Sequence, residues 1–213
     1  MKLLRLLTAL AGLAAASIAV AQGTVLYSWD FSKAANYGPT VEAPENSGGP
    51  EIIFRSGATL KVDADEQGRQ VLSFDGTQTD WGRSKRNIDP ISAIQLRLRF
   101  RPASTGAPLQ TIVSLCGCYE LRYNLGRSRL EFIVNLPEKK YLMVKADISP
   151  DVWNQAVATY KDGKLTLAVG LSRAEDVLPE GLRPVPISTS VRVGLVGERP
   201  FNGSISEFVV SEL

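Results

Sequence analysis

The sequence of 213 residues contains no histidine, and it has only two cysteines and two methionines. Without imidazole side chains the protein has no Ser-His-Asp triad, no histidine general acid and no zinc site that depends on histidine ligands. The absence of histidine therefore excludes many enzyme classes at once.

The first 21 residues carry charge of one sign only. Residues 1–21 carry Lys2 and Arg5 ahead of an apolar run, and they end in Ala19-Val20-Ala21, the small-x-small pattern that signal peptidase reads. The apolar run is rich in alanine and is shorter than the roughly 20 residues that span a bilayer. We therefore expect a cleaved signal peptide over residues 1–21 and not a membrane anchor.

Removal of this signal peptide takes away two cations and leaves 22 basic against 22 acidic residues. A chain without a broad basic field is a poor partner for nucleic acid, so that class of ligand is excluded. No cysteine stands at the end of the signal peptide, which argues against a lipid anchor. We expect residues 22–213 to form one exported domain, secreted or periplasmic, with no membrane span.

Alternation of apolar and polar residues is the strongest pattern in the chain. Residues 153–169 alternate on both sides of Asp162-Gly163, a pair typical of a two-residue type I′ turn in which both central residues need positive φ. This pattern predicts a β-hairpin. Its repeating apolar positions are Val157, Leu165, Leu167 and Val169.

Further runs with strand character follow one another at intervals of about ten residues, separated by turn signals. Residues 94–101 are the clearest, with four apolar side chains on one face and four polar ones on the other. One helical turn is expected at Ser172–Glu175, which has capping-box spacing, and a solvated turn at Asp63-Ala64-Asp65-Glu66. The other expected strands are 25–31, 51–54, 59–63, 71–74, 110–115, 119–123, 129–134, 141–145, 191–196 and 204–210.

In their order these motifs resemble the concanavalin A-like lectin and glucanase superfamily, in particular the bacterial laminin G-like (pentraxin-like) domains. The resemblance implies an all-β, antiparallel two-sheet jelly-roll sandwich that binds glycans or extracellular proteins, in some members with calcium. It covers about residues 70–210. The matching pieces are residues 72–76, 94–102, 110–114, 119–122, 153–169 and 200–207.

Glucanases of that superfamily carry their carboxylates on one strand as Glu-x-Asp-x-x-Glu. No such spacing occurs in this sequence. Retaining hydrolysis needs the nucleophile and the acid/base on the same strand face, so the sequence argues against catalysis by that route.

Candidate ligand-binding residues are aromatic and basic. Trp81 lies in a polar loop and is a candidate platform for a ligand, whereas Trp153 is expected to pack between the sheets, as large aromatics do in sandwiches. Arg97, Arg99 and Arg101 project from one face of residues 94–101 and would attract an anionic ligand. Arg122, Arg127 and Arg129 lie on strands or turns nearby in sequence. The alternative is a solvated sheet face, with these arginines paired across strands to Glu120 and Glu131.

Two chemical features stay open in the sequence. Cys116 and Cys118, separated only by Gly117, form either a strained disulfide or two free thiols in an oxidising compartment. Binding of calcium as a cofactor also stays open. Its candidate oxygen ligands are Asp75, Asp80 and Asp89, which lie outside any recognised loop motif.

The sequence as a whole favours a non-catalytic exported module that binds an extracellular or cell-envelope polysaccharide or protein. The alternative is a polysaccharide-active enzyme, a glycoside hydrolase or lyase, with an unrecognised site. Exposed aromatic residues beside a groove would favour glycan binding, whereas a cluster of buried carboxylates with raised pKa values would favour catalysis.

Overall fold

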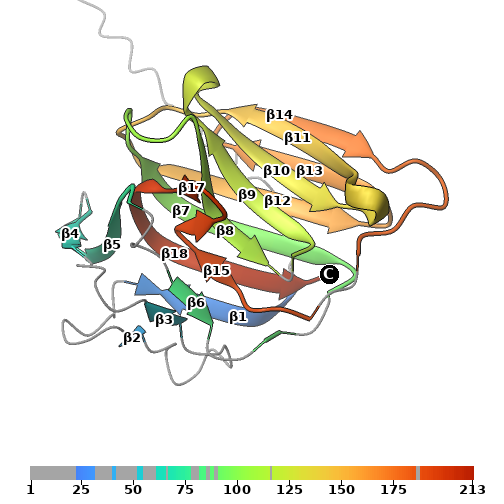
Figure 1. Cartoon of the computed structure of the whole chain (residues 1–213), viewed down its shortest axis with the longest axis horizontal. Helices are drawn as coiled ribbons and strands as arrows, with labels where there is room; N and C mark the ends of the chain where they lie inside the picture. The colour runs from blue at the N-terminus through green and yellow to red at the C-terminus, as the bar shows by residue number, and fades with distance from the viewer. Residues whose placement is uncertain are drawn as a thin grey trace, which may run out of the picture.

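Two antiparallel sheets make up most of the fold in the computed structural model (Figure 1). The structure describes residues 23–31, 40–41, 52–54, 61–65, 67–77, 82–84, 87–88, 91–115, 117–185 and 188–213. The signal peptide predicted over residues 1–21 lies outside this part of the chain.

The first sheet, sheet A, contains the hairpin that the sequence predicts. Its strands run in the order β14-β13-β12-β7-β18-β5-β4, and β1 also pairs with β18. Their bounds are β14 Ser172–Val177, β13 Lys164–Val169, β12 Asn154–Lys161, β7 Ile94–Pro102, β18 Asn202–Glu212, β5 Gln70–Asp75, β4 Lys61–Ala64 and β1 Thr24–Asp30.

The second sheet, sheet B, is built mostly from the middle of the chain, and its strands run in the order β11-β10-β9-β8-β15-β6-β3-β2. A two-stranded hairpin of β16 (Leu195–Val196) and β17 (Arg199–Pro200) follows β15 and lies against β8. The bounds in sheet B are β11 Tyr141–Asp147, β10 Arg129–Asn135, β9 Tyr119–Asn124, β8 Leu109–Leu115, β15 Arg192–Val193, β6 Gly82–Ser84, β3 Ile52–Phe54 and β2 Thr40–Val41.

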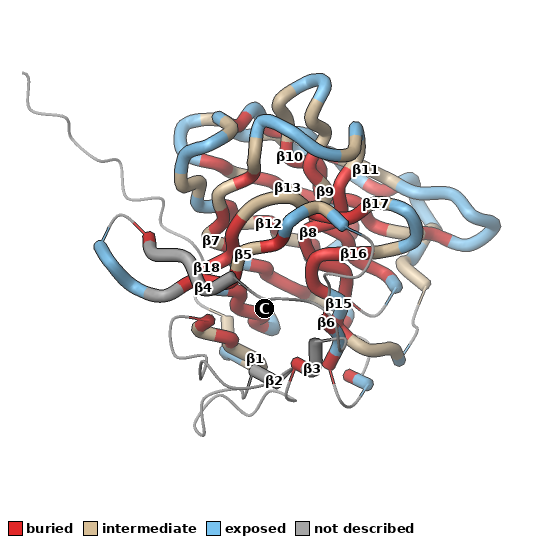
Figure 2. The backbone as a smooth tube through the Cα atoms, turned by 60° about the vertical axis from the view of Figure 1, so that its left-hand side comes forward, coloured by how far each residue is buried: buried red, intermediate tan, exposed pale blue. Residues whose placement is uncertain are grey.

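The core lies between the two sheets, and buried residues are concentrated along the central strands (Figure 2). Trp29 of β1 is fully buried, and its ring stacks on that of Phe208 in β18 with centroids 5.4 Å apart. Aromatic stacking of this kind adds to the gain from apolar burial. The all-β sandwich fold expected from the sequence is confirmed.

The hairpin of β12 and β13 forms as predicted, with Asp162 at φ 50° and Gly163 at φ 79°. The prediction of its apolar face was wrong for β12, because Val157 is only half-buried and lies opposite Arg97 on the outer face. The residues of β12 that enter the core are Ala156, Ala158 and Tyr160.

The helical turn expected at residues 172–175 is also wrong, because β14 continues from a tight turn at Gly170-Leu171 and pairs with β13 along its whole length. Cross-strand pairing overrides the weak local preference for a helix start. β14 is an edge strand, and its exposed charged residues protect the sheet from pairing with another chain.

Candidate functional site

The predicted arginine stripe lies on the outer face of sheet A, and its members differ in surroundings. Arg97 is exposed, whereas Arg99 and Arg101 are half-buried. Arg99 donates from Nη1 to Oδ2 of Asp65 at 2.9 Å and to Oγ of Ser206 at 3.2 Å. Hydrogen-bond donors of Arg99 are therefore engaged by other residues of the protein.

Trp153 also lies on this outer face, so the prediction that it packs between the sheets was wrong. The guanidinium carbons of Arg99 and Arg101 lie 4.5 and 5.4 Å from the centre of the Trp153 ring, within cation–π distance. The reason is register, since Asn154 pairs with the inward-facing Phe100 and its neighbour Trp153 faces outward. The indole thus supports two arginines.

The prediction of a solvated turn at Asp63-Ala64-Asp65-Glu66 was also wrong at Asp65, because the side chain of Asp65 is fully buried. Burial alone would raise the pKa of this carboxyl. Hydrogen bonds from the backbone and guanidinium of Arg69, the backbone of Gln67 and the side chain of Arg99 outweigh burial and hold the pKa well below its usual range. Asp65 anchors the turn between β4 and β5 to the stripe.

Several predicted site residues are outside the described residues, namely Trp81, Asp80, Asp89 and Cys116. Cys118 is described and buried, with its sulfur directed at the carbonyl oxygen of Val185, and the bridge to Cys116 stays a prediction. Asp75 is exposed and accepts a hydrogen bond from the backbone N–H of Thr77, as in a polar turn. Within the described part of the chain no group of three or more acidic or cysteine side chains is arranged to hold a metal ion.

A hollow of 340 Å³ lies beside the stripe, lined by residues that include Arg101, Asp151, Asn202 and Ser204. These groups bond mainly to other protein atoms. Hydrogen bonds from the side chain and backbone of Ser104 lower the pKa of Asp151. None of the described residues that line this hollow is an exposed aromatic.

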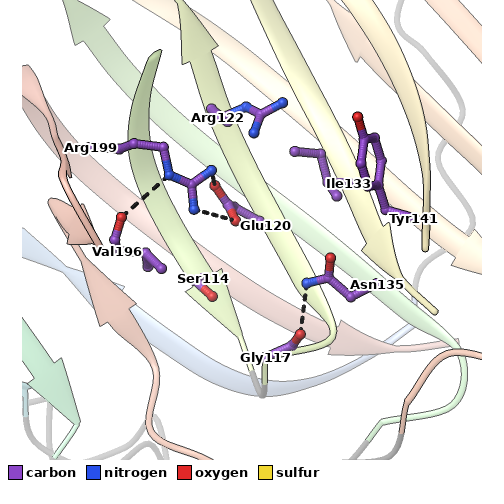
Figure 3. A pocket seen from close by; sticks show the side chains of 9 residues that line it. All are labelled: Ser114, Gly117, Glu120, Arg122, Ile133, Asn135, Tyr141, Val196 and Arg199. Carbon is purple, nitrogen blue, oxygen red and sulfur yellow. Dashed lines mark hydrogen bonds and ion pairs between the residues drawn. The ribbon is translucent and has the colours of Figure 1, made fainter. Parts of the chain in front are cut away.

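A different arrangement occurs on the outer face of sheet B, where a groove encloses 290 Å³ (Figure 3). Strands β8, β9 and β10 form its floor, the hairpin of β16 and β17 forms one wall, and β11 lies on the other side. The lining residues are Ser114, Gly117, Glu120, Arg122, Ile133, Asn135, Tyr141, Val196 and Arg199.

Glu120 is the first of two buried carboxylates at this groove. It accepts hydrogen bonds at Oε1 from the hydroxyl of Thr111 at 2.9 Å and at Oε2 from Nη2 of Arg199 at 3.2 Å. Nη1 of Arg199 also lies 2.8 Å from Oε1, so the guanidinium faces both carboxylate oxygens. This ion pair fixes the hairpin wall against the floor.

Glu131 is the second carboxylate, and it is held by Arg122 on the neighbouring strand. Nη2 of Arg122 lies 2.7 Å from Oε2, and the side-chain amide of Asn124 donates to Oε1 at 3.0 Å. The pairing of Arg122 with Glu131 confirms the cross-strand pairing expected from the sequence. The expectation of a solvated face was wrong for Glu120 and Glu131, because both are buried. Glu120 pairs instead with Arg199, which is 79 residues distant in the sequence, and neither carboxylate touches the stripe.

The rim of the groove carries an exposed aromatic side chain. Tyr141 begins β11 opposite Asn135 of β10 and is 57% exposed. Asn135 donates from its side chain to the carbonyl oxygen of Gly117 at 2.8 Å, and Ile133 provides apolar surface on the floor. The groove therefore combines hydrogen-bonding groups held by ion pairs with one aromatic face at its edge.

Sequence reasoning named Glu120, Glu131 and Arg122 only as members of a solvated face, and it did not single out Tyr141 or Arg199. Alternation places Glu120 and Arg122 on one face of a strand, which is a detectable signal. The contribution of Arg199 depends on a hairpin that folds back from another part of the chain. No local sequence pattern predicts that contact.

No protein-family model and no curated protein sequence matches the chain. Among the described residues, the helical segments are too short or too polar to cross a bilayer.

Solved structures with the same fold include bacterial toxin domains. The binding domain of Paraclostridial Mosquitocidal Protein 1 superposes with a TM-score of 0.67 at 10% identity, covering 89% of this chain and 49% of that domain. The receptor binding domain of botulinum neurotoxin D gives 0.63 at 15% identity, covering 89% and 50%. The chain thus spans about half the length of these toxin domains.

A native heptameric SAP-like pentraxin from Limulus polyphemus is also similar, with a TM-score of 0.53 at 14% identity, covering 66% of this chain and 76% of that one. These likenesses support the two-sheet jelly-roll sandwich and identify no family. At such low identities they establish the fold alone.

Proposed function

We propose that this protein is an exported, non-catalytic module that binds a polysaccharide in the groove on the outer face of sheet B. The observation that carries the proposal is the groove itself, with Tyr141 exposed at its rim above a floor of hydrogen-bonding groups. A sugar ring offers an apolar face that packs on an aromatic ring and hydroxyl groups that bond to fixed polar side chains. Binding sites for small molecules commonly combine these features.

The geometry of the two carboxylates supports binding over catalysis. Both oxygens of Glu120 and of Glu131 accept bonds from guanidinium, amide or hydroxyl groups of the protein. A glycoside hydrolase needs one carboxyl group to deliver a proton and a second to attack the sugar or activate water. Carboxylates engaged in ion pairs serve instead to hold Arg122 and Arg199 in place.

The names of the two toxin domains describe binding domains, and this gives independent support to a binding role. Because those likenesses rest on the fold, they do not name the ligand of this chain.

The test is a binding screen of residues 22–213 against a panel of neutral and acidic polysaccharides, followed by calorimetry on those that bind. We expect Tyr141→Ala to weaken binding by about fivefold or more, since truncating a contact aromatic commonly costs more than 1 kcal/mol. Tyr141 is more than half exposed, so the variant should fold normally. Leu171→Ala, which removes a fully exposed side chain from the tip between β13 and β14, is the control.

Unchanged affinity in Tyr141→Ala would contradict the assignment of the groove. Release of shortened products from any bound polysaccharide would replace the proposal by the hydrolase or lyase alternative, and Glu120→Gln and Glu131→Gln would then identify the catalytic group.

A further inference from the structure

The outer face of sheet B continues beyond the groove onto β15 and β6, and two arginines stand side by side there. Arg192 is the Cα partner of Ser114, which lines the groove, and Arg83 is the Cα partner of Arg192 on the next strand. Cross-strand partners point to the same face of a sheet. Arg83 and Arg192 therefore extend the face on which the groove lies.

The flanking residues confirm this orientation. Val191 and Val193, on either side of Arg192, are fully buried in the core, and Arg83 lies between the buried residues Gly82 and Ser84. Both arginines are exposed. Alternation thus directs the two guanidinium groups outward.

The two arginines also approach each other closely. The N–H of Ser84 donates to the carbonyl of Val191 at 2.9 Å, so these two residues occupy a hydrogen-bonded position of the ladder. The next pair, Arg83 with Arg192, then occupies a non-hydrogen-bonded position, where side chains are closest, with Cα atoms about 4.5 Å apart. Like charges placed directly opposite each other repel and destabilise a sheet.

The other arginines on this face are compensated by carboxylates. Arg122 pairs with Glu131, Arg199 with Glu120, and Arg129 with Asp147 at 2.8 Å. Arg83 and Arg192 have no ion pair or side-chain hydrogen bond with any described residue. Among the described residues, Arg83 and Arg192 are therefore two adjacent cations without a carboxylate partner, beside a groove whose own charges cancel.

We infer that Arg83 and Arg192 bind acidic groups of the polysaccharide, so that the ligand of this module is an anionic glycan. This inference rests on the proposed function, since it extends the same site. Guanidinium groups bind carboxylate and sulfate oxygens through paired, charge-assisted hydrogen bonds. From β11 to β6 the face crosses six strands, about 24 Å at the usual strand spacing, which suits an extended chain lying across the strands.

The test compares three polymers with one backbone: dextran, carboxymethyl dextran and dextran sulfate. We expect the native protein to bind one or both charged derivatives more tightly than dextran, with affinity that falls as salt rises. Arg83→Gln combined with Arg192→Gln should weaken that binding by about tenfold or more. Which derivative binds tighter distinguishes a sulfate from a carboxylate ligand, and either preference supports the inference.

The matched control is Lys161→Gln combined with Arg173→Gln, which removes the same charge from exposed positions of sheet A. Equal loss in both double variants, or no preference of the native protein for either charged polymer, would overturn the inference. The unfolding temperature of the Arg83 and Arg192 variant should be unchanged or raised, because like-charge repulsion is relieved. A fall would show that these arginines serve the fold instead.

The two proposals fail separately. If Tyr141→Ala abolishes binding to the polysaccharide panel while the Arg83 and Arg192 variant binds normally, the groove stands and the anionic ligand is wrong. If the arginine variant alone loses binding, the anion contacts stand and the groove assignment is wrong.

Discussion

At the scale of single residues, Asp65 shows how a charged side chain becomes part of the fold. It accepts hydrogen bonds from two backbone N–H groups and from the guanidinium groups of Arg69 and Arg99. Removing one partner of a buried charge leaves the other uncompensated. Replacing all three stripe arginines together would therefore disturb the fold as well as any ligand, and Arg97 is the member that can be changed alone.

The pKa of Asp65 predicts an acid-dependent loss of stability. Because its folded pKa is lowered, the stabilisation is fully present above the ordinary value of 3.8 and is lost as the pH falls below it towards the folded pKa. We expect Asp65→Asn to be less stable than the native protein at pH 7, with a smaller further loss below about pH 4. Denaturant unfolding of both proteins from neutral to acid pH measures the difference.

Other lowered pKa values, those of Asp151 and Glu175, contribute equally to both proteins and cancel in this comparison. Parallel loss of stability in the native protein and in Asp65→Asn would show that Asp65 is not an acid-sensitive anchor.

At the scale of elements, glycines with positive φ mark where the backbone is constrained. Gly163 has φ 79° in the turn between β12 and β13, and an added Cβ there would meet, among the described residues, only Leu178 at 4.0 Å. Gly203 in β18 has φ 148°, and its Cβ would lie 2.4 Å from the carbonyl oxygen of Arg101 and 2.9 Å from Cα of Pro102. The first position is limited by conformation and the second also by close approach of β7.

We therefore expect the two alanine substitutions to differ. Gly163→Ala should cost about 1 kcal/mol in unfolding free energy, the usual penalty for a left-handed L-residue. Gly203→Ala should cost clearly more, because backbone atoms of β7 must move. Urea unfolding of both variants gives the comparison, and a Gly203→Ala protein as stable as Gly163→Ala would contradict the close packing of β18 on β7.

The strands of the sandwich could largely be predicted, because alternation and an Asp-Gly turn act over a few residues. The face of β12 that enters the core could not be predicted. Two alanines and a tyrosine enter the core, whereas the sequence pattern favoured the opposite face with its valine. The groove was also beyond prediction, as the ion pair of Arg199 with Glu120 joins distant segments. Local patterns specify strands, whereas a site assembled from four strands and a hairpin depends on their tertiary arrangement.

At the scale of the whole molecule, β1 and β18 bring the beginning and the end of the described chain together. Thr24 pairs with Glu212, and Asp30 with Glu207, at one edge of β18. The strand begins three residues after the predicted cleavage site at Ala21. Removal of residues 1–21 therefore leaves β1 complete.

The last prediction follows from this arrangement. The exported protein should have the mass of a chain that begins at Gln22, and that chain should unfold cooperatively. A chain that begins at Ser32 loses Trp29 and Phe31, both fully buried. Loss of a large buried aromatic lowers the unfolding free energy by about 3 to 5 kcal/mol. Loss of both residues therefore approaches the roughly 5 to 15 kcal/mol that stabilise a typical domain. We expect no cooperative thermal transition by circular dichroism. In the chain that begins at Gln22, Trp29→Ala should lower the unfolding free energy by about 3 to 5 kcal/mol and leave the protein folded. This variant separates the effect of packing from that of truncation. A cooperative transition at an unchanged temperature in the chain from Ser32 would show that β1 is dispensable.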